Sequence, residues 1–321
     1  MRAQRITEHG GPERLDWAEV EEPRPGDEAL LVEVAAAGVN FIDTYHREGR
    51  YTVALPFIPG VEGSGTVLEV GARVADFAPG DRIAWCNAPG GYAERVAIPA
   101  ARAVHVPDGV PDDLAAAVLL QGFTAHYLAF DTFPLTAGDT CLVHAGAGGV
   151  GLLLIQLATA AGARVHATTS TDEKAALAAS AGAVAVHRYE GFADAIRQYE
   201  GKERPLDVVY DGVGATTFDE GLSLIRPRGL MALFGASSGP VPPFDLQGLN
   251  ANGSLYVTRP SLGHYIATRR ELDARARDVF GRIDAGTLDV RVGARFPLAD
   301  AADAHRALEG RATTGKVLLL P

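Results

Sequence analysis

The stretch CLVHAGAGGVGLLLIQLATAA, residues 141–161, decides the fold. It begins with a short apolar run, continues through the glycine-rich loop GAGGVG at residues 146–151, and ends with apolar residues at helical spacing. A strand, a glycine loop and a helix in this order form the first half of a βαβ unit. The stretch therefore predicts one strand of a parallel sheet and the helix that crosses over it.

The glycines of this loop have the spacing G-x-G-x-x-G, with Gly146, Gly148 and Gly151 at the three positions. The first permits a tight turn, the second lets the backbone approach a pyrophosphate, and the third allows close packing of the helix on the strand. Free N–H groups in this segment, which includes Gly149 and Val150, would face anionic oxygens. We expect a dinucleotide here; the alternatives are a glycine turn without a ligand and the adenosyl site of a methyltransferase.

The rest of the chain suggests two kinds of sheet. Apolar strands and helical patterns alternate from Thr140 to about Val257, which is typical of a doubly wound parallel sheet. A helical pattern at Thr268–Ala285 and two strand-like segments follow, and we expect this tail to return to the first domain. The first third instead shows short strands broken by glycine and proline, which predicts a small barrel-like β domain. These strands are expected at Leu30–Val34, Gly65–Val70, Asp81–Trp85 and Tyr92–Ile98.

The residues after the second strand of the parallel sheet indicate which dinucleotide binds. An NAD site would place a carboxylate there, about 20 residues beyond the glycine loop, but residues 166–170 are HATTS. Ser170 and the nearby Lys174 suit a 2′-phosphate, so we expect NADP(H). Asp172 and Glu173 are explained as residues of a helix N-terminus. The alternative for Lys174 is an ordinary solvated helix lysine.

Composition excludes several other classes of protein. The 321 residues carry 29 Lys and Arg against 40 Asp and Glu, a net charge of −11, which disfavours nucleic acid as the principal partner. No apolar run is long enough to span a membrane, and the N-terminus lacks a signal-peptide core, so we expect a cytoplasmic protein. Two cysteines, Cys86 and Cys141, form neither a four-thiolate zinc site nor a disulfide framework.

Four segments are informative: GVNFIDTYHREGRY (38–51), PGVEGSGTVLEVG (59–71), PGDRIAW (79–85) and GGYAERVAIP (90–99). They resemble the medium-chain dehydrogenase/reductase superfamily. A second set consists of VNFIDTYHREGRY (39–51), YDGVG (210–214), LFGASSGPV (233–241), GSLYVTRPSL (253–262) and RATTGKVLL (311–319). This set resembles the zinc-free, zeta-crystallin-like NADPH:quinone oxidoreductases of that superfamily. The resemblance covers essentially the whole chain. It implies an α/β protein in which a GroES-like β-barrel-type substrate domain (residues 1–122 and 259–321) and a Rossmann NADP-binding domain (residues 123–258) enclose a cleft.

The chain departs from the zinc-dependent members of this superfamily at every ligand position. Asn40 stands in place of a cysteine, Val61 in place of a histidine, and LLQGFT (119–124) where a further cysteine is expected. Only WCNAPGG (85–91) occupies the place of the structural zinc lobe. We therefore expect no metal, and acceptors that take a hydride without a Lewis acid, such as quinones and activated α,β-unsaturated carbonyls.

The resemblance also implies the site residues. Asn40, Tyr51 and Asp43 are the catalytic candidates: Asn40 to bind the carboxamide or the acceptor oxygen, Tyr51 to donate to a developing oxyanion, and Asp43 to order the loop. The alternative is that they are capping groups of a structured turn. Besides the glycine loop, Ser170 and Lys174, the implied cofactor contacts are Tyr45, Thr124, Tyr127, Tyr189, Phe234, Ser237, Ser238 and Arg311.

Together these observations predict metal-free reduction of quinones by NADPH. An alkenal or enone reductase and a cofactor-stabilised, crystallin-like binding protein remain as alternatives. The resemblance also implies a homodimer, joined near Ser254–Val257, because an exposed sheet edge favours pairing.

Overall fold

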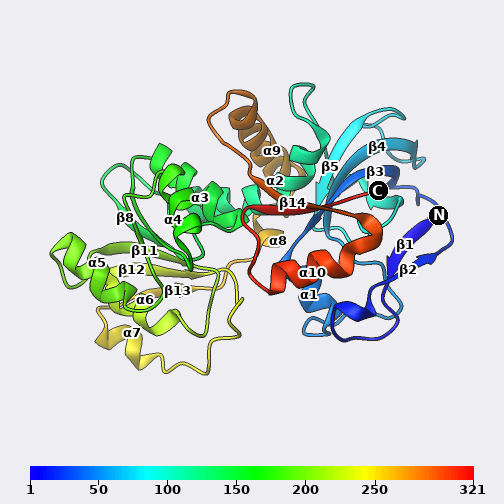
Figure 1. The fold of residues 1–321 in the computed structure, drawn as a ribbon. Helices are drawn as coiled ribbons and strands as arrows, with labels where there is room; N and C mark the ends of the chain where they lie inside the picture. Colours follow the sequence, from blue (N-terminus) through cyan, green and yellow to red (C-terminus); the bar gives the residue numbers. More distant parts are fainter. The chain divides into compact units, whose positions relative to one another are not determined.

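The computed structural model describes all residues from 1 to 321, and they form two compact units (Figure 1). Unit 1 consists of Met1–Phe123 and Ile266–Pro321, and unit 2 consists of Thr124–Tyr265. The predicted boundaries followed residues 122 and 258. Helix α2 (Asp112–Tyr127) runs across the first boundary, which lies in its last turns.

Unit 2 is built on a six-stranded, wholly parallel sheet in the order β10-β9-β8-β11-β12-β13. Counted within the unit, this order is 3-2-1-4-5-6, so the prediction of a doubly wound sheet is confirmed. The chain reverses its direction of winding between β8 and β11. The carboxyl ends of these two strands are where such sheets bind ligands. The strands are β8 (Thr140–Val143), β9 (Arg164–Thr168), β10 (Ala185–His187), β11 (Leu206–Asp211), β12 (Ile225–Leu233) and β13 (Tyr256–Thr258).

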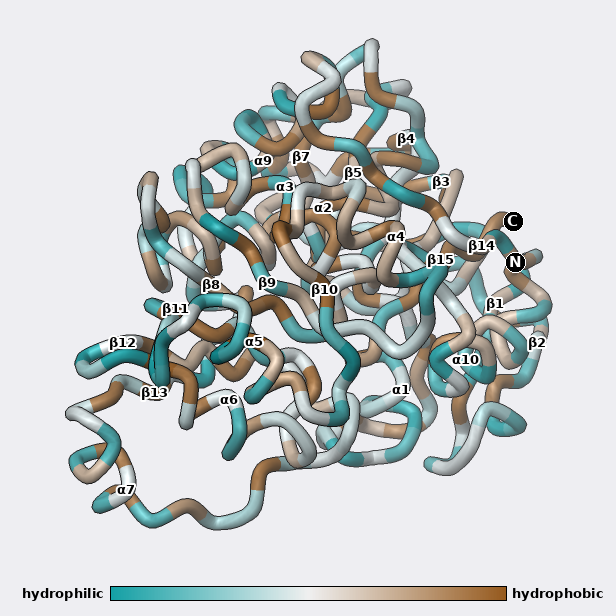
Figure 2. Tube along the Cα trace, turned by 60° about the vertical axis from the view of Figure 1, so that its left-hand side comes forward, coloured by the Kyte–Doolittle hydropathy of each residue, from teal (hydrophilic) through white to brown (hydrophobic).

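Helices connect the strands of unit 2. The crossover helix α3 (Gly149–Ala160) buries most of its residues because it is apolar nearly all round. A π-helical turn at Leu128–Thr132 continues α2. In Figure 2 the apolar residues, drawn in brown, run along the interior strands. The other helices are α4 (Asp172–Ser180), α5 (Phe192–Glu200), α6 (Phe218–Leu224), α7 (Gln247–Ala251) and α8 (Leu262–Tyr265).

Unit 1 contains a curved, mostly antiparallel sheet in the order β14-β15-β3-β4-β5-β7, with β6 also paired to β3. A separate two-stranded sheet joins β1 (Arg2–Arg5) and β2 (Asp16–Glu19). The large sheet comprises β3 (Ala29–Val39), β4 (Glu62–Val70), β5 (Arg82–Cys86), β6 (Arg95–Pro99), β7 (Ala103–His105), β14 (Val292–Pro297) and β15 (Lys316–Leu320). Its helices are α1 (Phe41–Arg47), α9 (Arg269–Asp284) and α10 (Ala301–Glu309).

The C-terminal strand closes unit 1, as expected from the sequence. β15 pairs antiparallel with β3, and Val317 lies opposite Val39. Both strands contribute buried side chains to one core, which also contains Trp85 and Ile98. The two ends of the chain therefore form a single unit, although more than 140 residues of unit 2 separate them in the sequence.

The four predicted strands of unit 1 are present, but their bounds differ. β5 is shifted by one residue, and β4 begins at Glu62 instead of Gly65. β3 continues to Val39 because Ala35–Gly38 are small residues that lie close to neighbouring groups: a side chain at Gly38 would overlap Glu62 and Lys316. β6 begins only at Arg95, since the backbone N–H of Tyr92 donates to Pro59 in a turn. None of the helices is long and apolar enough to cross a membrane.

Candidate functional site

The glycine loop of unit 2 has the geometry that its spacing predicts. A Cβ atom at Gly146 would lie 2.8 Å from the Cβ of Ala167 on β9. A Cβ at Gly151 would overlap the carbonyl oxygen of Ala145 and lie 2.9 Å from the Cα of Gly146. Side chains at these two positions would push the helix and the loop apart. The glycines are therefore required for the close packing of α3 against the end of β8.

The same loop leaves donors for an anion. Gly148 is the N-cap of α3, and the helical hydrogen bonds begin with Leu152 N–H donating to the carbonyl oxygen of Gly148. The N–H groups of Gly149, Val150 and Gly151 therefore lie outside the helical ladder. They lie at the N-terminus of α3, which is the positive end of the helix dipole and therefore favours an anion. These N–H groups fit a pyrophosphate. A residue with a bulky side chain in this segment would block the approach of the phosphates to them.

The loop after β11 lies at the carboxyl edge of the same sheet. Asp211 is fully buried, and its Oδ1 accepts from the backbone N–H groups of Val213, at 2.7 Å, and Gly214, at 3.0 Å. Its Oδ2 accepts from the Thr217 hydroxyl at 2.8 Å. These contacts fix the turn of the YDGVG motif, next to the end of β8. Asp211 thus has a structural explanation.

Three predicted cofactor residues follow β12 beside this turn. Phe234 donates its backbone N–H to Asp211, and its ring lies against Gly212, where a Cβ would come within 2.9 Å of the ring. The N–H of Ser237 donates to the carbonyl of Gly212 at 3.2 Å. The hydroxyl of Ser238 donates to the carbonyl of Val213 at 2.8 Å. The structure therefore brings the segments after β11 and β12 together at one edge.

The end of β9 holds the residues predicted to recognise a 2′-phosphate. Ser170 is exposed, and Lys174 is half-buried in the first turn of α4, whose N-cap is Thr171. Arg188, at the end of β10, forms an ion pair of 2.5 Å with the exposed Asp172. The carboxylate of Asp172 thus has a cationic partner. This arginine was not among the predicted residues, because its nearness to Asp172 depends on the β9–β10 pairing.

Tyr189 lies next to a buried histidine. Its ring is nearly parallel to that of His144, with centroids 6.4 Å apart. His144 is 1% exposed; its Nδ1 is 2.8 Å from the hydroxyl of Thr168, and its Nε2 has no partner. Burial lowers the pKa of His144 to about 4, although Asp211 acts in the opposite direction. His144 is therefore a neutral side chain of the sheet interior at neutral pH.

The remaining predicted cofactor residues lie in different surroundings. Thr124 and Tyr127 are buried at the end of α2, and the Tyr127 ring stacks on Tyr265 at 4.1 Å. Arg311 is an exposed residue of unit 1 with a left-handed backbone, φ 55°. The expected cleft between the two domains, and the role of these three residues in it, stay predictions.

In unit 1 the catalytic candidates lie around the start of α1. Asn40 is the N-cap of this helix and is only 5% exposed. Its Oδ1 accepts a hydrogen bond of 2.7 Å from the ammonium of Lys316, on β15. Its Nδ2 donates to Glu62 Oε2 at 3.0 Å and to the carbonyl of Gly38 at 3.2 Å. Both amide hydrogens are thus committed to the protein, and one acceptor site remains at Oδ1.

Glu62 and Lys316 form a buried ion pair behind Asn40. Their side chains are 0% and 1% exposed, and the Lys316 ammonium donates to Glu62 Oε2. The other carboxylate oxygen of Glu62 accepts from the backbone N–H of Leu120 at 2.7 Å. The pair therefore joins β15, β4 and α2 around the Asn40 amide. With its donors used here, Asn40 can accept a hydrogen bond from a carboxamide but cannot donate to an acceptor oxygen.

Asp43 is completely buried in the first turn of α1. Its Oδ2 accepts from the backbone N–H of Asn40 at 2.9 Å, which completes a capping box, and from the hydroxyl of Tyr92 at 3.2 Å. Its Oδ1 has no partner. Burial is the main reason that the pKa of Asp43 is raised to about 7; the Asn40 N–H, Lys316 and Tyr92 oppose this shift. Asp43 thus caps the first turn of α1, and its part in the site stays a prediction.

Tyr45 and Tyr51 lie edge to face at the other end of α1, with centroids 5.8 Å apart. The guanidinium of Arg50 lies over the Tyr45 ring at 5.3 Å. Tyr51 is 47% exposed, so its phenol is accessible to a bound molecule. The structure thus brings Asn40, Asp43, Tyr45 and Tyr51 together within one short helix and the turn that follows it.

The residues around Asn40 do not fit a zinc ion. The donor set consists of an amide, the aliphatic Val61 and an ion pair in which an ammonium already contacts Asn40 and Glu62. Nowhere in the chain do three His, Cys, Asp or Glu residues come together as a possible metal site. Both cysteines are buried as free thiols. This donor set offers no site for a metal ion beside Asn40.

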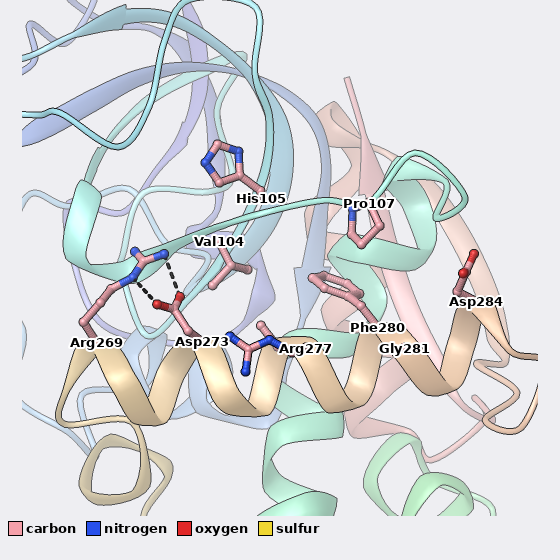
Figure 3. A pocket seen from close by; sticks show the side chains of 10 residues that line it. Val104, His105, Pro107, Arg269, Asp273, Arg277, Phe280, Gly281 and Asp284 are labelled. Carbon is pink, nitrogen blue, oxygen red and sulfur yellow. Dashed lines mark hydrogen bonds and ion pairs between the residues drawn. The ribbon is translucent and has the colours of Figure 1, made fainter.

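A groove of about 380 Å³ elsewhere in unit 1 lies between α9 and β7 (Figure 3). Phe280 and Val104 provide apolar walls, and Arg269 is paired with Asp273 at 2.7 Å. None of the residues predicted from the sequence lines this groove. It takes no part in the candidate site.

Sequence reasoning missed Glu62 and Lys316. Lys316 stands at the start of the otherwise apolar strand KVLLL, and Glu62 follows the buried Val61. A single charge within an apolar segment was the available signal. Which partner it would meet depends on the pairing of β15 with β3, and this could not be read from spacing.

Known proteins resemble this chain over its full length. Residues 26–108 match the family model described as the alcohol dehydrogenase GroES-like domain, and residues 149–274 match the one described as zinc-binding dehydrogenase. A quinone oxidoreductase of Pseudomonas aeruginosa is 43% identical, with 98% of this chain and 97% of that protein covered. A 2-haloacrylate reductase of a Burkholderia species is 38% identical, with 98% of each covered.

Solved structures agree with these matches. The crystal structure of Escherichia coli quinone oxidoreductase complexed with NADPH superimposes with a TM-score of 0.98 and 40% identity, and all of both chains is covered. Identity at this level over complete chains includes the GroES-like unit, the Rossmann unit and their order. The chain therefore belongs to the quinone oxidoreductase family of the medium-chain dehydrogenase/reductase superfamily.

Proposed function

We propose that this protein catalyses the NADPH-dependent reduction of quinones by direct hydride transfer, without a metal. The observation that carries this proposal is the carboxyl edge of the unit 2 sheet. There a pyrophosphate cradle lies beside a strand end that has Ser170, Lys174 and an Asp172 paired with Arg188. Relatives named quinone oxidoreductases, one of them solved with NADPH, support the choice of cofactor and acceptor.

Each group of residues has a task in this proposal. The N–H groups at the start of α3 bind the pyrophosphate, and Ser170 and Lys174 bind the 2′-phosphate. When bound, the dihydronicotinamide supplies the hydride. Asn40 accepts a hydrogen bond from the carboxamide through Oδ1, which holds the ring in one orientation. The exposed phenol of Tyr51 donates to the acceptor oxygen as negative charge develops on it.

The stoichiometry requires one hydride and one proton for each quinone. The hydride and the proton together convert the quinone to its hydroquinone and leave NADP⁺. Because Tyr51 is half-exposed, water can deliver the proton beside it. A buried protein acid is therefore unnecessary, and catalysis consists mainly of positioning.

Initial rates of NADPH oxidation test this proposal. Purified, chelator-treated protein is assayed with 1,4-benzoquinone and with a simple alkenal, and the assays are repeated with NADH. We expect quinone-dependent oxidation that survives chelation and is faster with NADPH at low cofactor concentration. Loss of activity on chelation, or equal use of NADH, would contradict the proposed site.

A second candidate is reduction of an activated carbon–carbon double bond. The 2-haloacrylate reductase among the relatives favours it. Both reactions need the same cofactor site, so the acceptor distinguishes them: a saturated carbonyl product indicates double-bond reduction, and a hydroquinone indicates the first proposal. NADPH binding without turnover of either acceptor would favour a cofactor-stabilised binding protein.

We also propose a homodimer joined at the edge of the unit 2 sheet. β13 pairs only with β12, and Tyr256 and Val257 on it are 63% and 39% exposed. An unpaired apolar edge strand favours pairing with a second copy. Light scattering should give a dimer mass that falls to a monomer for Tyr256→Lys with Val257→Lys, but not for the control Leu246→Lys, which replaces another exposed apolar residue. A wild-type monomer would contradict this.

The expected cytoplasmic location stays a prediction.

A further inference from the structure

A chain of hydrogen bonds in unit 1 connects the surface of α10 with the buried Asp43. The Nη1 of Arg47 is 2.9 Å from Nδ1 of His305, and Nε2 of His305 is 3.1 Å from the Tyr92 hydroxyl. This hydroxyl is 3.2 Å from Asp43 Oδ2. Arg47, Tyr92, His305 and Asp43 are each at most 1% exposed. Nothing described above for the cofactor or the acceptor uses the first three.

The arginine fixes the direction of every bond in the chain. A guanidinium only donates, so Nδ1 of His305 must accept, and a neutral imidazole then carries its hydrogen on Nε2. Burial, and next the charge of Arg47, lower the pKa of His305 to about 3, which keeps the ring neutral. Nε2–H therefore donates to Tyr92. The hydroxyl of Tyr92 is left to donate to Asp43.

This directed chain does not conduct protons. To pass a proton outward from Asp43, Nε2 of His305 would have to accept it through a free lone pair. In this tautomer Nε2 already carries a hydrogen. Passing one inward would leave an anionic imidazole. Arg47, at the outer end, has no proton to release. The chain can only hold its members in place.

What it holds is the start of α1. Asp43 Oδ2 receives the Tyr92 hydroxyl and the backbone N–H of Asn40 at the same time. Arg47 also joins the end of the helix to Glu309 on α10, at 2.7 Å, and its Nε donates to Gly10 at 3.0 Å. Both ends of the seven-residue helix are therefore tied to α10 or to Tyr92.

We propose that Arg47, His305 and Tyr92 are positioning residues, whose directed hydrogen bonds clamp α1 so that Asn40 and Tyr45 are presented to the bound cofactor and acceptor. The clamp is strongest when Asp43 is ionised, because a carboxylate accepts more strongly than a carboxylic acid. The effect of the clamp on catalysis rests on the proposed function. The direction of its hydrogen bonds is independent of that function.

The clamp predicts how Asp43 titrates. The charged groups that act on this carboxyl are Lys316, which favours ionisation, and Glu62, which opposes it, besides burial. The Tyr92 hydroxyl and the Asn40 N–H favour ionisation as donors. Removing the Tyr92 hydroxyl should therefore raise the pKa of Asp43 above its present value of about 7.

The first measurement needs no activity. Nitrogen-15 NMR of histidine-labelled wild-type protein should show His305 as the Nε2–H tautomer, unprotonated down to about pH 5. Carbon-13 NMR of labelled aspartate should show one carboxyl titrating near pH 7, as its pKa implies. A His305 ring with hydrogen on Nδ1, or one that protonates near pH 6.5, would overturn the proposal even if quinone turnover is normal.

The second measurement uses Tyr92→Phe, with Tyr210→Phe as the matched control, a buried tyrosine hydroxyl of unit 2. The acidic limb of kcat/KM against pH should move upward by about one pH unit for Tyr92→Phe only. A merely structural role of either hydroxyl would lower the stability of its variant without moving the acidic limb of kcat/KM. A shift of this limb in Tyr92→Phe alone is specific to the proposed clamp. An unmoved limb in a folded Tyr92→Phe protein contradicts the proposal, whereas absent turnover in the wild type contradicts the proposed function alone.

Discussion

Lys316 donates a hydrogen bond of 2.7 Å to Asn40, a residue 276 positions earlier in the chain. The contact exists because the C-terminal strand pairs with β3, whose end leads directly into Asn40. A buried ammonium consequently contacts the amide of Asn40, at the position where the zinc-dependent members of the superfamily are expected to carry a cysteine. It orients the Asn40 amide, and Glu62 balances its charge.

Breaking the Lys316–Glu62 pair should be costly. Lys316→Met leaves the Glu62 carboxylate buried without its partner, and Glu62→Gln leaves the ammonium in the same state; we expect each to lower the free energy of unfolding by about 3–5 kcal/mol. The double variant removes both charges and should lose clearly less than the sum of the two. Urea denaturation of the four proteins measures this, and additive losses would show that the pair is not coupled.

Lys174 should discriminate between the two nicotinamide cofactors. Lys174→Ala removes one charge-assisted contact to the 2′-phosphate, worth about 1.5–3 kcal/mol, so the Kd for NADPH should rise about 10- to 100-fold while that for NADH stays the same. Lys202→Ala, at an exposed position of the same unit, is the control and should change neither. Titration of cofactor fluorescence gives the constants. An equal effect on both cofactors would place Lys174 outside the phosphate pocket.

Gly151 should tolerate no side chain. In Gly151→Ala the new Cβ meets the Ala145 carbonyl, so α3 must move away from the loop; NADPH binding should weaken and the protein should lose stability. Gly281→Ala offers a contrast, because this helical position in α9 has no atom within 4 Å of its Cβ. It should gain about 0.5–1 kcal/mol from better helix propensity. Calorimetry and cofactor titration decide; unchanged NADPH binding in Gly151→Ala would refute the cradle.

His144 should make stability depend on pH. Its pKa is about 4 in the folded protein against 6.5 ordinarily, so between these values the unfolded chain binds more protons. The free energy of unfolding therefore rises as pH increases through this window, by about 2 kcal/mol from pH 5 to pH 7 for this residue. His187 acts in the same sense and Asp43 in the opposite one.

The comparison of variants isolates the part that belongs to His144. In His144→Gln the rise in stability from pH 5 to pH 7 should be smaller than in the wild type by this amount. Urea denaturation at the two pH values measures it. Parallel stability curves for the two proteins would mean that His144 is not buried in its neutral form.

The sequence was sufficient to predict the parallel sheet, because the glycine loop is a local feature whose neighbours in the chain are also its neighbours in space. The α9 helix was equally predictable from the sequence, because the capping box of Thr268 and Glu271 that begins it lies within four residues. The C-terminal return of β15 was expected only in outline. Its register against β3 depends on long-range pairing, and the position of Lys316 follows from that register.

The candidate site was predictable to the same extent. The segment from Asn40 to Tyr51 was identified through its resemblance to known motifs, and its residues do lie together. Their bonding was not predictable, since the partners of Asn40 and Asp43 come from β4, β15 and the turn at Tyr92. Likewise Arg188 reaches Asp172 only because β10 lies beside β9. Local motifs therefore located the site, and tertiary pairing determined its charges.

The central claim, direct hydride transfer from a positioned NADPH to a quinone, is tested most directly by a single-turnover isotope experiment. Protein saturated with NADPH that carries deuterium at either the pro-R or the pro-S position of C4 is mixed with 1,4-benzoquinone in a stopped-flow instrument. A ring held in one orientation predicts slower oxidation with one deuterated epimer and an unchanged rate with the other. Equal rates for both epimers, or no quinone-dependent oxidation, would contradict the account.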